Sequence, residues 1–204
     1  MKSVLMSVQP YWVFLIIAQK MGWKIGEEKT VEVRKNCPKD DKWDKGVNIY
    51  CTKDKKSFAR IPKEYQPLME KFLGKVIGEF VCDEVDTIQK RGVGNCFDYC
   101  YLNLNEWGND DIEIEILDIK KSCVSKEELN LYGQNVYRLY AWHISNLVIY
   151  NNPRELGEFY VSVKDHWETY DPNKYINGCW QKPLTRPPQS WCYVESEVIT
   201  NEQI

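Results

Sequence analysis

The chain has 204 residues, of which 43% are apolar and 28% are charged, close to the average of globular proteins. This composition excludes collagen-like, wholly disordered and membrane-channel proteins, and a chain of this length can fold without a metal or a disulfide. The net charge of −3 is spread unevenly: residues 1–75 carry 16 Lys and Arg against 9 Asp and Glu, whereas residues 76–204 carry 11 against 21. The basic first part favours a polyanionic ligand, and the acidic second part leaves a protein partner open. The alternative is that the two parts intermix in the fold and their charges cancel.

The predicted elements begin with a strand over Lys2–Val8, followed by a buried helix over Pro10–Met21. Its core is the apolar run Tyr11–Ala18, whose eight residues are too few to cross a bilayer, which takes ~20. No small residues of the kind found at signal-peptide cleavage sites follow the run, because Gln19 and Lys20 come next. We therefore expect a core helix in a soluble protein that does not enter the membrane.

Further along the chain, period-two alternation and turn residues predict short strands, and a capping box beginning at Ser125 predicts a short helix. The predicted strands cover residues 30–34, 46–52, 74–83, 112–116, 140–150 and 187–195, and a second short helix covers 62–72. Residues 54–73 form a basic insertion, residues 157–183 form an irregular aromatic one, and residues 196–204 form a flexible tail. This pattern predicts an α+β protein, a small, partly open β-barrel with an early buried helix and inserted loops and short helices.

The cysteines indicate a reducing environment. The chain has eight of them and no Asn-x-Ser/Thr glycosylation acceptor, so we expect free, packed thiols and a cytoplasmic location. Cys96 and Cys100 form the single close pair, and no Cys-x-x-Cys or close His pair accompanies them. We therefore predict no metal and no other cofactor.

Three segments carry a family resemblance when they are taken together. They are the opening Ser3-Val-Leu-Met-Ser-Val-Gln-Pro10 before an apolar helix, then Gly26-Glu-Glu-Lys-Thr-Val-Glu-Val-Arg-Lys35, and finally Gly74-Lys-Val-Ile-Gly-Glu-Phe80. In this combination the sequence resembles the ASCH domain family, a branch of the PUA-like barrels. Two more segments, Ala141–Ser145 and Pro187–Trp191, are similar to those of prophage-type members. The resemblance covers roughly residues 1–53, 74–88, 137–156 and 184–195. It implies a single PUA-like domain over residues 1–195, with the two insertions added to it.

The Lys-Thr-x-Glu-x-Arg motif has side chains suited to a single nucleotide. Glu32 and Arg34 share one face of the predicted strand, about 7 Å apart, and Lys29 precedes them at a helix-to-strand corner. A carboxylate accepts from an exocyclic amine, a guanidinium binds phosphate or a base edge, and a lysine can do either. The alternative is an ordinary ion pair on a solvated strand beside a surface lysine.

Aromatic side chains could add the stacking surface for a base. The candidates are Tyr11, Trp12, Trp142 and Trp191, although tryptophans placed like Trp142 and Trp191 more often belong to a core. The predicted binding set is completed by three polar residues from the resembling segments, Thr30, Ser145 and Gln189. We interpret His143 as a structural residue, and His166 carries no signal.

Three functional hypotheses remain open. The first is an RNA- or modified-nucleoside-binding protein, since the resembling family is generally regarded as RNA-binding. The second is an enzyme, because the resemblance also implies N4-acylcytidine amidohydrolase or ribonuclease activity. The third is a phage-encoded factor that binds a host protein through its acidic part.

The amidohydrolase hypothesis matches the sequence only in part. It requires three residues: the motif lysine, a Thr two residues after the motif Thr, and a later Glu. Lys29 matches the first, but Glu32 occupies the position of the second. Glu79 and Glu84 are candidates for the third. Lys29 would act as a base or nucleophile only with a lowered pKa, and a nearby Glu32 would raise it. The departure at Glu32 therefore disfavours this chemistry.

Overall fold

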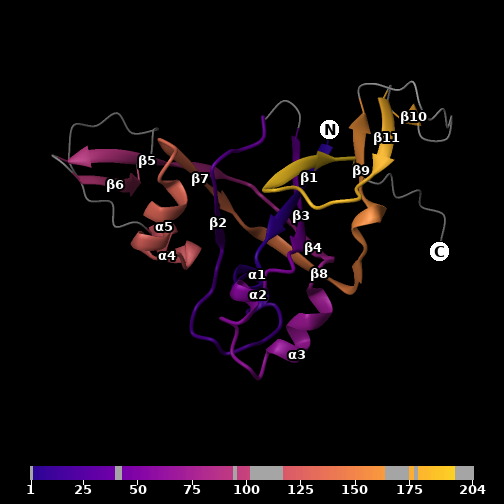
Figure 1. Cartoon of the computed structure of the whole chain (residues 1–204), viewed down its shortest axis with the longest axis horizontal. Coiled ribbons are helices and arrows are strands. Elements are labelled where there is room, and N and C mark those ends of the chain that lie inside the picture. Colours follow the sequence, from indigo (N-terminus) through magenta and orange to yellow (C-terminus); the bar gives the residue numbers. More distant parts are fainter. Residues whose placement is uncertain are drawn as a thin grey trace. The chain divides into compact units, whose positions relative to one another are not determined.

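The structure, a computed structural model, describes residues 2–39, 43–93, 96–101, 117–163, 175–176 and 179–195 (Figure 1). The chain divides into two compact units, each assembled from segments that are distant in sequence. The first unit comprises Met1–Tyr11, Lys39–Phe80 and Val148–Ile204, and the second comprises Trp12–Pro38 and Val81–Leu147. The predicted segment 112–116, His166 and the predicted tail at 196–204 lie outside the described residues.

The first unit is built on a five-stranded sheet with the order β12-β1-β3-β4-β8. Its strands are β1 (Lys2–Val8), β3 (Trp43–Cys51), β4 (Val76–Val81), β8 (Ser145–Arg154) and β12 (Trp191–Val194). The central pair β1–β3 is parallel and β1–β12 is antiparallel. Six of the seven residues of β1 are buried, as expected for a strand covered on both faces.

Smaller elements complete the first unit. The predicted basic insertion forms the short helices α2 (Lys55–Phe58), α3 (Gln66–Met69) and η2 (Glu70–Phe72). The aromatic segment, expected to be irregular, contains η3 (Leu156–Glu158) and the strands β9 (Tyr160–Val163), β10 (Tyr175–Ile176) and β11 (Cys179–Pro183), which form a sheet with the order β10-β11-β9. The core of this unit includes Leu5, Tyr50, Val76, Phe159 and Val194.

The second unit is built on a four-stranded sheet with the order β2-β7-β5-β6. Its strands are β2 (Val31–Arg34), β5 (Val85–Val93), β6 (Cys96–Tyr101) and β7 (Arg138–His143), and its helices are α4 (Leu117–Ser122), α5 (Lys126–Gly133) and most of α1 (Pro10–Ile17). One face of this sheet contributes Val31, Val33, Ile88, Leu139 and Ala141 to a core that also contains Leu129 of α5. Because side chains alternate along a strand, Glu32 and Arg34 of β2 lie on the opposite face.

The α+β class is confirmed, and none of the three sheets formed by the described strands closes on itself. The strand predicted over residues 140–150 is in fact two strands, β7 and β8, which belong to different sheets. They part at Ile144, and Asn146 adopts a positive φ of 48°, which Asn tolerates better than most residues. The early helix ends at Ile17 rather than at Met21, with turns up to Gly22 at φ 71°. Strands β5 and β6 were not predicted.

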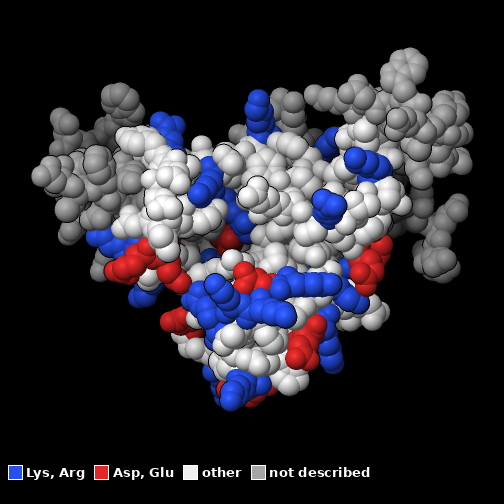
Figure 2. Space-filling view, in the orientation of Figure 1, with Lys and Arg blue, Asp and Glu red and all other residues white. Residues whose placement is uncertain are grey.

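Two surface properties bear on function. Among the described residues, none of the helices combines the length and the apolar character that are needed to span a bilayer. The face shown in Figure 2 carries both basic and acidic side chains.

Candidate functional site

The Lys-Thr-x-Glu-x-Arg motif enters strand β2 of the second unit, and its backbone is held from three directions. The Lys29 N–H donates to the Leu15 carbonyl of α1 at 3.4 Å, and the Thr30 N–H donates to the Lys121 carbonyl of α4 at 3.0 Å. The Thr30 carbonyl in turn accepts from the Ile144 N–H at 2.9 Å. These contacts fix the corner from which the lysine side chain departs.

The three charged side chains of the motif form one buried cluster. Lys29 Nζ lies 3.2 Å from Glu32 Oε2, and Arg34 Nη2 lies 3.0 Å from Glu32 Oε1, so each oxygen of the carboxylate meets one cation. The residues are 2%, 5% and 8% exposed, which excludes the alternative of a solvated surface pair. We refer to Lys29, Glu32 and Arg34 as the charged triad.

Two further contacts complete the surroundings of Lys29. Its Nζ donates to the Ser122 carbonyl at 2.6 Å, and it lies 5.0 Å from the centre of the Trp12 ring, within the range of a cation–π interaction. Trp12 is only partly buried. The ammonium group therefore acts in this arrangement as a charged hydrogen-bond donor held against an aromatic face.

The charged triad is costly to bury, and its charges do not cancel. Moving an ion out of water costs several kcal/mol even after relaxation, and an opposite charge offsets this only in part. Two cations and one carboxylate leave the three side chains with a net charge of +1. Such a group is suited to an anionic ligand.

The other predicted residues of the second unit have different surroundings. Trp142 is directly opposite Glu32 in the β2–β7 pairing, and it is 0% exposed, so the protein covers its ring on all sides. This burial corresponds to the core alternative for that residue. The Ser145 hydroxyl donates to the Val81 carbonyl at 2.8 Å.

Three predicted residues lie in the first unit instead. The Tyr11 ring is covered by the Arg60 guanidinium at 3.9 Å, and Gln189 is exposed. Trp191 is partly buried and meets Tyr193 edge-on, with ring centres 5.4 Å apart. Direct contacts thus join four of the predicted residues, namely Trp12, Lys29, Glu32 and Arg34.

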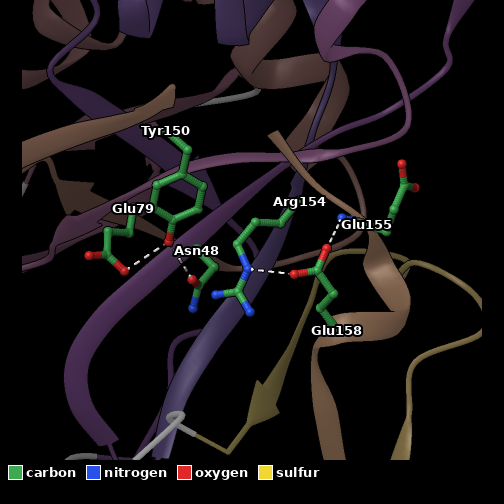
Figure 3. Close-up of polar contacts among 6 residues, drawn as sticks. All are labelled: Asn48, Glu79, Tyr150, Arg154, Glu155 and Glu158. Carbon is green, nitrogen blue, oxygen red and sulfur yellow. Dashed lines mark hydrogen bonds and ion pairs between the residues drawn. The ribbon is translucent and has the colours of Figure 1, made fainter. Parts of the chain in front are cut away.

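A separate polar network in the first unit was not predicted, although Glu79 belongs to it (Figure 3). The Tyr150 hydroxyl lies 3.0 Å from Glu79 Oε2 and 3.3 Å from Asn48 Oδ1, and Arg154 Nε donates to Glu158 Oε2 at 3.0 Å. Burial and the neighbouring Glu79 carboxylate raise the pKa of Tyr150 above its ordinary value. The phenol of Tyr150 is therefore a protonated donor at neutral pH.

Comparison with known proteins gives structural neighbours but no match by sequence. No protein-family model matches the chain, and no curated protein matches it either. The ASCH protein from Zymomonas mobilis is similar in structure, with 15% sequence identity and a TM-score of 0.48, and the alignment covers 96% of this chain and 90% of that chain. Two mutants of that protein align with the same identity and TM-score. The alignment with the Tyr-to-Phe mutant covers 95% of this chain and 90% of the mutant chain. The alignment with the Ser-to-Ala mutant covers 94% of this chain and 87% of the mutant chain. These structural neighbours are ASCH proteins. That is also the family that the sequence motifs resemble.

Sequence reasoning missed the groups that α4, α5 and the segment between them bring to the charged triad. Ser122 contributes a backbone carbonyl, which no side-chain pattern reveals. Burial raises the pKa of the Cys123 thiol, and the nearby Lys29 charge lowers it in part. Burial also raises the pKa of Tyr132; the Arg34 charge lowers this pKa and the Glu32 charge raises it. These residues are about 90–100 positions from the motif, so only the folded chain shows the relation.

Proposed function

We propose that the chain is an ASCH-domain protein that binds RNA or a modified nucleotide at the charged triad, with Trp12 as the stacking surface. The observation that carries this proposal is the burial of Lys29, Glu32 and Arg34 in direct contact, with two cations for one carboxylate. The motif from which the three residues come is the one that the sequence shares with a family regarded as RNA-binding.

Each group of the site has a role in this proposal. Arg34 is the most exposed of the three, and its guanidinium is the group that meets a phosphate. Glu32 holds both cations by its two oxygens, so it positions them and limits their repulsion. Trp12 is partly exposed and offers its indole to a base, an interaction worth about 1–3 kcal/mol.

The contacts of Lys29 support binding rather than amidohydrolase chemistry. Its ammonium faces the Glu32 carboxylate at 3.2 Å and the Ser122 carbonyl at 2.6 Å, and both are acceptors for a charged donor. A lysine base or nucleophile requires the neutral amine. The proposal therefore gives Lys29 an electrostatic role, with no bond made to it.

The test is a titration of the full chain into a fluorescein-labelled single-stranded RNA, followed by anisotropy at several salt concentrations. Binding should weaken steeply as salt rises if phosphates are contacted. Loss of a charged hydrogen bond costs about 1.5–3 kcal/mol, so Arg34→Gln should weaken binding by roughly 10-fold or more. Unlabelled CMP should compete with the RNA better than cytidine, because Arg34 needs the phosphate.

Lys35→Gln is the matched control, since it removes the same charge from the next residue. Its ammonium lies 5.0 Å from the Tyr132 ring centre, outside the charged triad, so this variant should bind RNA as the wild type does. Equal weakening by both variants would mean that only bulk charge matters, and the proposal would be wrong. Arg34→Lys retains the buried charge, so this variant should stay folded while only the guanidinium fork is lost. A wild-type chain that captures no RNA at low salt would favour the host-protein hypothesis instead.

A further inference from the structure

We propose that the second unit also contains a binding site for a first-row divalent metal ion, formed by Glu84, Asp86 and His143. One ligand atom from each of the three residues lies within 4.8 Å of the other two. Within this cluster, His143 Nε2 and Asp86 Oδ2 are 2.8 Å apart. Of the three residues, the sequence suggested a functional role only for Glu84, as one candidate for the later glutamate of the amidohydrolase hypothesis.

The antiparallel pairing of β5 and β7 brings the three residues together. Asp86 is opposite Ala141, and His143 is two residues beyond Ala141, so Asp86 and His143 lie on the same face of the sheet. Glu84 precedes Asp86 by two residues, and its carbonyl accepts from the His143 N–H at 3.0 Å. The Cys82 thiol donates to that same carbonyl at 3.2 Å. Backbone hydrogen bonds of the sheet thus fix the positions of the segments that carry the three ligands, so the site needs little rearrangement to bind an ion.

The spacing and the chemistry of the cluster fit a metal ion. Ligands bonded at about 2.0–2.2 Å stand roughly 3.0–3.4 Å apart around one ion, a separation that small side-chain rotations reach here. Two carboxylates with a neutral imidazole carry a charge of −2, which a divalent cation balances. The imidazole favours first-row metals such as Mn²⁺ or Fe²⁺ over Mg²⁺ and Ca²⁺, which take oxygen ligands. Three protein ligands leave the remaining coordination positions to water.

A simple ion pair accounts for only part of the cluster. His143 and Asp86 could neutralise each other, but Glu84 then adds a second carboxylate beside the first. Like charges at this distance repel unless a cation lies between them. The side chains of Asp86 and His143 are each 20% exposed and Glu84 is exposed, so an ion can reach them from solvent.

The metal site is independent of the proposed nucleotide site. His143 pairs with Val31 of β2, whereas Trp142 pairs with Glu32, so the two clusters lie on opposite faces of the sheet. Metal binding can therefore be measured without RNA, and failure of either proposal leaves the other standing.

The experiment is a Mn²⁺ titration of the chelator-treated full chain, in which electron paramagnetic resonance counts the free ion. We expect one Mn²⁺ per chain, with at least 10-fold weaker competition by Mg²⁺, which binds imidazole poorly. Glu84→Gln, Asp86→Asn and His143→Gln should each lower the affinity 10-fold or more. Asp83→Asn is the matched control, because it removes a neighbouring exposed carboxylate that is not in the cluster.

The folded state of each variant is followed by its thermal midpoint, with and without Mn²⁺. Mn²⁺ should raise the midpoint of the wild type and of Asp83→Asn, and at the same concentration it should raise that of Glu84→Gln less, since the exposed Glu84 side chain can change without disturbing the core. Three results would overturn the proposal: no saturable Mn²⁺ binding, equal weakening by Asp83→Asn, or His143→Gln that binds like the wild type.

Discussion

Neutralising Glu32 tests whether the charged triad is as buried as the structure shows. Glu32→Gln keeps the size of the side chain but removes the one negative charge between Lys29 and Arg34, which are 2% and 8% exposed. Breaking a buried ion pair costs about 3–5 kcal/mol, because the remaining charge is left without compensation. That loss is a large part of a total stability of about 5–15 kcal/mol. At about 2–4 °C per kcal/mol for a chain of this size, the thermal midpoint should fall by roughly 6–20 °C.

The measurement is urea unfolding followed by circular dichroism, with Glu27→Gln as the control. Glu27 is exposed on the same unit, so its substitution should change the free energy of unfolding by no more than about 0.5 kcal/mol. The double variant Lys29→Met/Glu32→Gln should lose less than the sum of the two single changes, because the lysine charge is no longer stranded. The reasoning fails if Glu32→Gln costs less than about 1 kcal/mol, or if its effect disappears at 1 M salt, where surface pairs are screened.

Two further predictions concern the first unit. Gly78→Ala should destabilise the chain by about 1–3 kcal/mol, because a Cβ at Gly78 would lie 2.2 Å from the Val148 carbonyl oxygen of β8. The control is Gly157→Ala, which should be nearly neutral in the same urea unfolding experiment because nothing lies within 4 Å of the added Cβ. Equal effects of the two variants would contradict the close approach of β4 and β8. Because the pKa of Tyr150 is raised in the folded chain, the unfolded chain loses this proton first above pH about 10, and the free energy of unfolding falls as the pH rises. Tyr150→Phe should make that fall less steep between pH about 9 and 11. An unchanged slope would show that the hydroxyl is not held protonated beside Glu79.

Several elements could be predicted because their signals are local. The strand over Lys2–Val8 is confirmed, as is the capping box, in which the Ser125 hydroxyl accepts from the Glu128 N–H and the Glu128 carboxylate accepts in return. The alternation of Val with polar residues predicted strand β2, and the structure confirms it over Val31–Arg34. Each of these signals depends on residues no more than a few positions apart.

Elements that depend on distant partners could not be predicted in the same way. Residues 140–150 have the composition of one continuous strand, but the segment leaves one sheet and joins another, and sheet membership depends on β2, β4 and β5. Asp86 and His143 are 57 residues apart, so no spacing rule places their side chains in contact. Ser122 meets Lys29 through a backbone carbonyl, which is common to all residue types.

The amino-acid sequence by itself determined that Glu32 and Arg34 share one strand face, because successive side chains of a strand alternate. It also determined that this pair follows a lysine at a chain corner and that a buried apolar helix precedes all three. Only the tertiary structure decided that this face is covered, and that the carboxylate therefore holds both cations away from water. Burial is a property of the segments that pack over a strand, and those segments come from distant parts of the chain.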